Sequence, residues 1–299
     1  MNIQRKIINI IWALYLLPFL SFGQNTIGFP YIANFNKSTY GAGTQNWDIK
    51  QDKNGLIYFA NNEGLLVHDG KYWKTYPLPN KTIVRCVLIN EDKIYVGGQD
   101  EIGYFSPDKS GTLSFHSLAT KIPVKLRSFG DVWDACLQNN SLFFRASNTI
   151  FRFSKDEMTG AYPAPNEWTY MGICDGTLYA CDMKTGLHSF INNRWTTIES
   201  TNHLPINEPV TSIFPLRNKT IIATLKNGLF ELIGNTIQPF LPAELSGISR
   251  QRIYGCTNVS EIEFVIATNF GGIYIIDVSG TVIQKFSMKE GLQNNNNNN

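Results

Sequence analysis

A unit of four short apolar segments recurs along this 299-residue chain, and this repeat constrains the fold more than any other feature. Its clearest mark is an apolar segment that ends in small polar residues and is followed by a glycine and an apolar residue. Gly186, Gly228 and Gly272 carry this mark in successive units, at spacings of 42 and 44 residues. A period of about 40 to 45 residues with four strands per unit is typical of propeller blades and not of helical repeats. We therefore predict an all-β protein, a β-propeller of four-stranded antiparallel blades.

The blades can be delimited from the same pattern. Turn-forming pairs fall between predicted first and second strands, as at Asp175-Gly176, and between third and fourth strands, as at Asp69-Gly70. About six blades are present, and we predict them near 46–82, 83–130, 131–167, 168–209, 210–252 and 253–293.

The two ends of the repeat predict that the ring is incomplete. The residues that follow Lys289 resemble the lead-in to another blade, while residues 24–45 form a lead-in that could donate a closing strand. The asparagine run at 294–299 predicts a polar tail without a core. We expect an incomplete ring of sevenfold type, and hence a fragment of a longer protein.

Residues 1–23 have the features of a secretory signal peptide. Arg5 and Lys6 precede a mostly apolar run of 14 residues from Ile7 to Leu20, and small residues follow at Ser21 and Gly23. The run is shorter than the roughly 20 residues that a spanning helix needs, and no second long apolar run follows it. The sequence therefore predicts export to the periplasm without a membrane span other than this signal. Retention as an N-terminal anchor is the alternative left open.

The charge balance and the cysteines limit which partners, metals and cofactors the chain is expected to bind. Lys and Arg number 26 against 24 Asp and Glu, so that removal of the two signal-peptide cations leaves 24 against 24. A neutral chain lacks the basic surface that nucleic acid requires, so no direct nucleic-acid binding is expected. The five cysteines show no metal-ligand spacing. Across a hairpin at Asp175-Gly176, Cys174 would lie opposite Thr177 and Cys181 opposite Tyr170, too far apart for a disulfide. We expect five free, buried cysteines, no metal site and no cofactor.

Catalysis is the class of function that the motifs favour least. The four histidines are isolated, and the chain has neither a Gly-x-Ser-x-Gly nucleophile motif nor a His-Glu-x-x-His metal motif. Asp100 and Glu101 are adjacent on a predicted loop, which does not give the facing carboxyl pair that glycoside hydrolysis needs. We predict that the chain is not an enzyme, with a propeller hydrolase or lyase as a remote alternative.

Several segments resemble a known family. They are Gln45 to Ile49, Tyr58 to Leu66, Asp69-Gly70, Ile83 to Arg85 and Tyr95 to Phe105. These segments are similar to the two-component-regulator propeller family, the N-terminal extracytoplasmic sensor region of bacterial membrane-bound transcriptional regulators and hybrid histidine kinases. The resemblance spans roughly residues 27–293 and is specific in the first two blades. It implies one or two sevenfold rings, followed by an immunoglobulin-like domain, a transmembrane helix and a histidine kinase or helix-turn-helix output module.

The loop face of the propeller is the predicted ligand site. In a propeller, the loops that enter the first strands and those that join second to third strands open on one face, and a rigid ring directs them to one point. The repeat places the following residues there: Asn46, Trp47, Asn61, Asn62, Glu63, Arg85, Gln99, Asp100, Glu101, Trp133, Asp182, Lys226, Arg252 and Asn269, with Asn148, Lys184 and Phe270 at the same level.

This mixture of amides, charges and aromatic rings suits a small or oligosaccharide ligand, because rings stack on apolar sugar faces and amides bind hydroxyls. For each residue the competing interpretation is a turn or packing role. The sequence leaves open a second class of function, a scaffold whose propeller binds another protein or a second copy as a homodimer.

Overall fold

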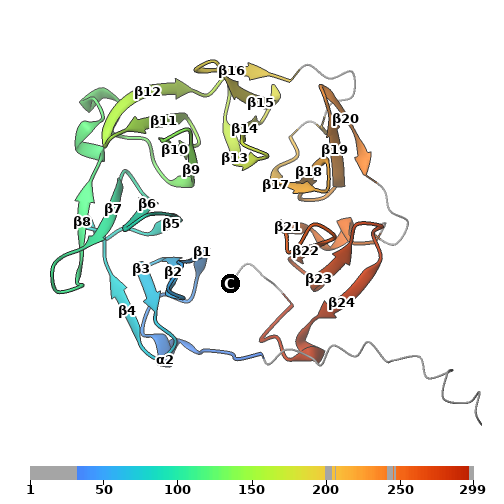
Figure 1. Ribbon diagram of the computed structural model, residues 1–299, viewed down its shortest axis with the longest axis horizontal. Coiled ribbons are helices and arrows are strands. Elements are labelled where there is room, and N and C mark those ends of the chain that lie inside the picture. Colours follow the sequence, from blue (N-terminus) through green and yellow to red (C-terminus); the bar gives the residue numbers. More distant parts are fainter. Residues whose placement is uncertain (1–31, 199–203, 206, 241–244, 246, 296–299) are drawn as a thin grey trace, which may run out of the picture. The chain divides into compact units, whose positions relative to one another are not determined.

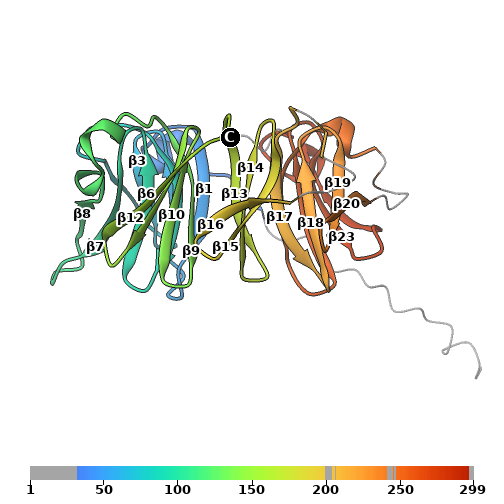
Figure 2. The same ribbon diagram turned by 90° about the horizontal axis from the view of Figure 1, so that it is seen from above.

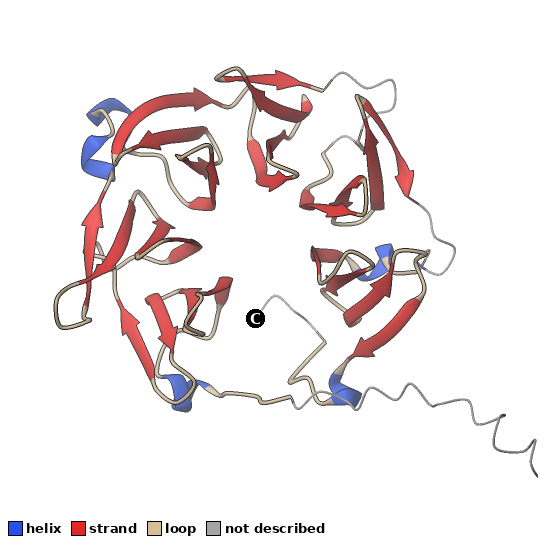
Figure 3. Cartoon of the chain, viewed as in Figure 1, coloured by secondary structure: helices blue, strands red, loops and turns tan. Residues whose placement is uncertain are grey.

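The computed structural model describes residues 32–198, 204–205, 207–240, 245 and 247–295. The chain divides into two compact units, Met1–Ala33 and Asn34–Asn299. Every sheet lies in the second unit. The predicted signal peptide, residues 1–23, lies outside the described residues. Helix is limited to short segments between strands (Figure 3). These helices are α2 (Lys37–Tyr40), η2 (Ala119–Lys121), η3 (Val124–Leu126), η5 (Ser249–Gln251) and η6 (Met288–Glu290).

Residues 34–295 form six antiparallel sheets of four strands, each connected in chain order. The sheets surround a common centre, and the first strand of each is innermost (Figure 1). The innermost strands are β1 (Asn46–Gln51), β5 (Val84–Asn90), β9 (Val132–Gln138), β13 (Trp168–Cys174), β17 (Val210–Leu216) and β21 (Ile253–Asn258). The second strands are β2 (Ile57–Asn61), β6 (Lys93–Gly98), β10 (Ser141–Ala146), β14 (Thr177–Asp182), β18 (Lys219–Thr224) and β22 (Glu263–Thr268).

The third strands are β3 (Gly64–His68), β7 (Ile102–Pro107), β11 (Thr149–Ser154), β15 (Gly186–Ile191), β19 (Gly228–Ile233) and β23 (Gly272–Asp277). The outermost strands are β4 (Trp73–Tyr76), β8 (Leu113–Ser117), β12 (Glu157–Pro163), β16 (Arg194–Thr197), β20 (Thr236–Phe240) and β24 (Val282–Phe286). We number the sheets blade 1 to blade 6 in chain order. The predicted all-β propeller with six four-stranded blades is confirmed.

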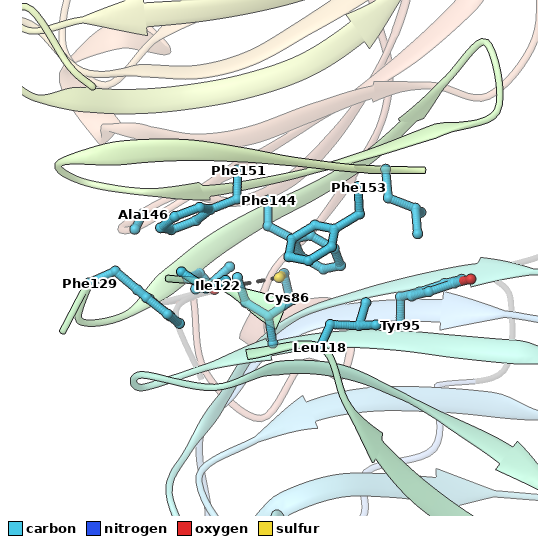
Figure 4. Packing of buried hydrophobic residues seen from close by; sticks show 12 residues of the cluster. Cys86, Tyr95, Leu118, Ile122, Phe129, Phe144, Ala146, Phe151 and Phe153 are labelled. Carbon is cyan, nitrogen blue, oxygen red and sulfur yellow. Dashed lines mark hydrogen bonds between the residues drawn. The ribbon is translucent and has the colours of Figure 1, made fainter. Parts of the chain in front are cut away.

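The hydrophobic core lies between blades. Five clusters of buried apolar side chains each join one pair of consecutive blades, from blades 1 and 2 to blades 5 and 6. Figure 4 shows the cluster between blades 2 and 3, where Tyr95 and Cys86 face Phe144 and Phe153. Because both faces of blade 3 are covered by neighbouring blades, β10 is entirely buried and most of β11 is buried as well, although each strand contains an arginine.

Each innermost strand contains a β-bulge near its start. The pairing with the second strand skips one residue in every blade, and that extra residue has no cross-strand partner. The skipped residues are Trp47, Arg85, Trp133, Thr169, Thr211 and Tyr254.

In blades 1 to 5, the residue that follows the bulge forms a hydrogen bond with the next blade. The bonds are Val87 N to Asp48 Oδ2 at 3.0 Å, Cys86 Sγ to Val132 O at 3.4 Å, Met171 N to Asp134 Oδ2 at 2.8 Å, Ile213 N to Tyr170 Oη at 2.9 Å and Cys256 N to Ser212 Oγ at 2.7 Å. In blade 6 this position is Gly255, which has no side chain with which to reach another blade. Ile49 in blade 1 occupies the position that Val87 has in blade 2. Its amide donates to Asp48 Oδ1 of its own blade at 2.8 Å. These hydrogen bonds therefore connect consecutive blades from blade 1 to blade 6.

The ring is open between blade 6 and blade 1 (Figure 1). Within the described residues, no buried apolar cluster joins these two blades. The described part of the lead-in, residues 32–45, contains α2 and no strand, and Asn34 Nδ2 donates to Gly291 O at 2.9 Å. Residues 24–31 of the expected closing strand lie outside the described residues. The sevenfold type of the ring stays a prediction.

The start of the asparagine run is attached to blade 6. Gly272 N donates to Asn295 O at 3.2 Å, and Met288 N donates to Asn295 Oδ1 at 2.8 Å. The remainder of the run, residues 296–299, lies outside the described residues. The polar tail without a core stays a prediction.

The five cysteines are free thiols on strands, as predicted, and four of them are buried while Cys256 is half-buried. Cys174 pairs with Thr177 and Cys181 with Tyr170 across the β13–β14 hairpin, which confirms the predicted register. Burial raises the pKa of Cys86 well above its usual value, so this thiol stays protonated and serves as a core side chain.

Candidate functional site

The bulge residues gather functional side chains at the start of the innermost strands, on the predicted loop face. A bulge turns its extra side chain away from the cross-strand pairs. Trp47, Arg85, Trp133, Thr169 and Thr211 are half-buried, and Tyr254 is 38% exposed. The repeat thus presents one side chain per blade around the centre, and these side chains differ in chemistry.

Arg85 contacts two tryptophans, one from each of the blades that flank its own. Its guanidinium carbon lies 4.0 Å from the ring centroid of Trp47 in blade 1 and 4.4 Å from that of Trp133 in blade 3. The two indoles meet edge to face, with centroids 5.7 Å apart. Both rings lie within cation–π distance of the guanidinium, and this arrangement links three blades. We call Trp47, Arg85 and Trp133 the arginine clasp.

The charge of the clasp is balanced by Asp131, on the loop that leads into β9. Asp131 Oδ2 accepts from Arg85 Nη2 at 2.7 Å and from Arg85 Nε at 3.1 Å. Arg85 Nη1 is buried and has no hydrogen-bond partner among the described residues. The clasp therefore retains one buried donor that a ligand or water can use.

The loop between β6 and β7 holds Asp131 in place. Gln99 forms a bridge with Asp131, while Asp100 and Gly130 bond to each other twice, Gly130 N to Asp100 Oδ1 at 2.7 Å and Asp100 N to Gly130 O at 2.9 Å. The predicted site residues Gln99 and Asp100 thus hold the loop that carries Asp131, the partner of Arg85.

Blade 1 contributes a further predicted residue at the clasp. Trp47 Nε1 donates to the exposed Asn62 Oδ1 at 2.8 Å. By contrast, Asn61 is fully buried and bonds to both the amide and the carbonyl of Gly43, at 3.0 and 2.7 Å, and to Asn46 Oδ1 at 2.8 Å. Asn61 and Asn46 therefore hold the lead-in against β2. Glu63 is exposed, and among the described residues its one hydrogen bond runs from its backbone amide to Asn61 Oδ1.

A second group of predicted residues lies in blade 6 on the same face. Arg252 lies over the ring of Phe270, with 5.6 Å between the guanidinium carbon and the ring centroid, and Phe270 is 60% exposed. Asn269 is buried, and its Oδ1 has no hydrogen-bond partner among the described residues. Burial raises the pKa of Tyr254, and the positive charge of Arg85 opposes this effect only in part.

Other predicted site residues are used elsewhere. Glu101 Oε1 accepts from Ser117 Oγ at 2.7 Å and from Ile102 N at 3.2 Å, and burial raises the pKa of its carboxyl. Lys226 is exposed, and its backbone amide donates to Glu208 Oε1. These two residues do not join the clasp.

Asp182 is built into the backbone of blade 4. Its side-chain oxygens accept from the amides of Asn166 and Glu167, both at 2.8 Å, and from those of Lys184 at 3.1 Å and Thr185 at 2.9 Å. Burial acts to raise the pKa of Asp182, but these amide bonds outweigh it and hold the pKa well below its usual value. A carboxylate bonded in this way fastens the loops around β14.

We expect Asp182→Asn to destabilise the protein at neutral pH, because an amide cannot accept all of these bonds. Since the folded-state pKa is depressed, the stabilising contribution is complete above the unfolded value of about 3.9 and is lost as pH falls through the folded value. The stability gap between the wild type and Asp182→Asn should therefore narrow below about pH 4. Urea unfolding at pH 7 and pH 3 measures this, and a gap that stays constant would contradict the assignment.

The sequence-based prediction missed Asp131, Thr169, Thr211 and Tyr254. A signal for three of them was present, since each follows the first buried apolar residue of its innermost strand, as Tyr254 follows Ile253. Asp131 lies on a loop 46 residues from Arg85, so only the packing of blade 2 against blade 3 reveals their ion pair.

Within the described part of the chain, no group of three or more histidine, cysteine or acidic side chains is placed to hold a metal ion. The helices described there are too short or too polar to cross a lipid bilayer.

No protein-family model and no curated protein matches the chain by sequence. Solved structures do match its fold. The extracellular domain of BT4673 from B. thetaiotaomicron, solved as a proposed one-component system, has a TM-score of 0.66 and 19% identity, over 90% of this chain and 37% of that one. A second structure of this domain, there named a proposed hybrid two-component system, has a TM-score of 0.63 and 19% identity, over 86% of this chain and 35% of that one.

An enzyme also has this fold. Virginiamycin B lyase from Staphylococcus aureus matches with a TM-score of 0.61 and 14% identity, over 81% of this chain and 84% of that one. The chain spans only about a third of the BT4673 domain, at 37% and 35% in the two structures. The chain therefore shares the β-propeller fold of the BT4673 extracellular domain and of a lyase.

Proposed function

We propose that this chain is the extracytoplasmic ligand-sensing propeller of a two-component-type or helix-turn-helix transmembrane regulator, and that it is exported to the periplasm. The fold shared with the BT4673 extracellular domain supports this proposal, as does the resemblance of blades 1 and 2 to regulator propellers. The ligand is a carbohydrate-like or other small molecule that binds at the loop face without being converted.

The observation that carries the proposal is the bulge repeated in all six innermost strands. It directs two indoles, a guanidinium and a phenol to one face, held by rigid sheets, while the hydroxyls of Thr169 and Thr211 donate to backbone carbonyls of their own blades. Aromatic faces and hydroxyl groups together suit a polyhydroxylated ligand. Binding could signal by favouring one arrangement of the blades over another.

The carboxylates around the clasp support a non-catalytic role. Asp131 is paired with Arg85, Asp100 binds the Gly130 amide and Glu101 binds Ser117. Each of these groups is already occupied by a structural bond, so general acid–base chemistry would first have to break it. The lyase among the structural matches shows that the fold itself permits catalysis.

A thermal-shift screen of the full chain against neutral and acidic oligosaccharides tests the proposal. A ligand at a hundred times its Kd should raise the free energy of unfolding by about 2.7 kcal/mol. Tyr254→Ala and Trp133→Ala should each weaken the binding about fivefold, by loss of a stacking ring.

Ile233→Ala is the matched control, because Ile233 is 53% exposed at the opposite end of blade 5. Equal weakening by all three variants would place the ligand elsewhere. Stabilisation that depends only on protein concentration would instead support the scaffold or homodimer alternative.

A further inference from the structure

A groove of about 850 Å³ lies between blades 1 and 2, at the ends of the strands opposite the loop face. Its walls are the turns that join β1 to β2, β3 to β4, β5 to β6 and β7 to β8. Figure 2 shows the turn after β7 projecting outward from the ring at its lower edge. The other cavities described here, near Asp182 and near Arg152, measure about 230 and 260 Å³. A volume in the range of about 300 to 1,000 Å³ is typical of a binding site.

The floor of this groove is apolar. Leu56, Val67, Ile89 and Leu113 line it, and each is only partly buried in the core between blades 1 and 2. Tyr72 stands at the rim with 64% of its surface exposed. Apolar side chains left accessible between two rigid blades can be covered by an apolar side chain of a partner.

The rim of the groove is acidic. Asp52, Asp69, Glu91 and Asp92 line it, against Lys53 and Lys74. Lys74 Nζ lies 4.8 Å from the ring centroid of Tyr76, so its positive charge already interacts with this ring inside the groove. Glu91 and Asp92, both exposed, form no ion pair or side-chain hydrogen bond with any residue that the structure describes.

One rim carboxyl, that of Asp69, stays ionised to a lower pH than an ordinary aspartate. Asp69 Oδ1 accepts from the amides of Tyr72 at 2.6 Å and Lys71 at 2.8 Å, and these bonds lower the pKa of its carboxyl. The rim thus offers negative charge directly above an apolar floor.

We propose that this groove docks an extended peptide segment of another protein that carries an apolar side chain next to a basic one. The apolar side chain covers the floor beneath Tyr72, and the basic side chain pairs with the free carboxylates of Glu91 and Asp92. Aromatic rings also line the groove, at Tyr58, Tyr72, Trp73 and Tyr76, so the floor alone does not select the occupant. The acidic rim favours a basic peptide over a neutral sugar, because complementary charge attracts the peptide and not the sugar. This second site lies on the face opposite the arginine clasp, so that a ligand and a protein partner can be bound together.

Fluorescence anisotropy with labelled hexapeptides and the full chain tests the proposal. One probe alternates leucine and lysine, and the other alternates leucine and glutamate. We expect the lysine probe to bind and the glutamate probe to bind at least about tenfold more weakly, with the difference shrinking as salt screens the rim. The double variant Glu91→Gln/Asp92→Asn should weaken the lysine probe about tenfold, and Tyr72→Ala about fivefold.

The matched control is Glu261→Gln/Glu263→Gln, which removes the same charge at the β21–β22 turn of blade 6, equivalent to the β5–β6 turn. It should leave the affinity within about twofold of that of the wild type. Equal losses in both double variants would overturn the proposal, because they would indicate nonspecific charge attraction. So would tighter binding of a neutral oligosaccharide than of the lysine probe, or a dimer that Tyr72→Ala dissociates.

Discussion

Asp134→Ala should cost about 3 to 5 kcal/mol of unfolding free energy, because it leaves a buried arginine without its counter-charge. Arg145 is 5% exposed; its Nε donates to Asp134 Oδ2, and its Nη1 donates to Trp168 O at 2.8 Å. The same carboxylate oxygen accepts from Met171 N at 2.8 Å, so Asp134 also ties blade 3 to blade 4. Urea unfolding of the variant measures the loss.

Asp48→Ala is the matched control for this prediction. Asp48 occupies the equivalent position in blade 1 and accepts from Val87 N at 3.0 Å, but its charged partner Lys50 has 44% of its side chain exposed. Its removal should cost only about 1 kcal/mol. The double variant Asp134→Leu/Arg145→Met should recover most of the loss, since it removes both charges. Equal costs for Asp134→Ala and Asp48→Ala would show that the buried charge does not decide the effect.

Gly272→Ala is expected to destabilise the protein by about 3 kcal/mol, from a strained backbone and an overpacked contact. Gly272 has a φ of +87°, and a Cβ there would lie 2.1 Å from the backbone oxygen of Phe286. Since that oxygen belongs to the neighbouring strand β24, relief requires the blade edge to move.

Gly186→Ala separates the two causes. Gly186 begins the third strand of blade 4 with a φ of +80°, and a Cβ there meets nothing within 4 Å. Only the backbone strain remains, so we expect about 1 kcal/mol. Denaturant midpoints of the two variants provide the comparison, and a cost for Gly186→Ala as large as that for Gly272→Ala would refute the contribution of the contact.

The repeated glycine explains why the blade pattern could be recognised from sequence. Gly64, Gly186, Gly228 and Gly272 all begin third strands with positive φ, between +80° and +128°. A left-handed turn between two strands favours glycine whatever the rest of the blade contains. Turn pairs such as Asp175-Gly176 are fixed by the same local geometry, so the six-bladed fold and the Cys174–Thr177 register were both predictable.

The role of a polar loop residue was less predictable, as Asp182 shows. The repeat places it correctly at the end of β14, but its side chain turns inward to accept backbone amides from both flanking loops. Periodicity along a strand gives the position of a residue and not the direction of its side chain at a loop. The same reason hid Asn61, which is fully buried.

The sequence alone determined the elements that depend on neighbours in the chain: strand, turn and glycine at each repeat, and hence the propeller of six four-stranded blades. Only the tertiary structure decided which repeats meet. It brings Arg85 into contact with both Trp47 and Trp133 and pairs it with Asp131, and it forms a groove beneath Tyr72. These contacts join residues tens of positions apart, and they are set by the way whole blades pack, a property that no local pattern encodes.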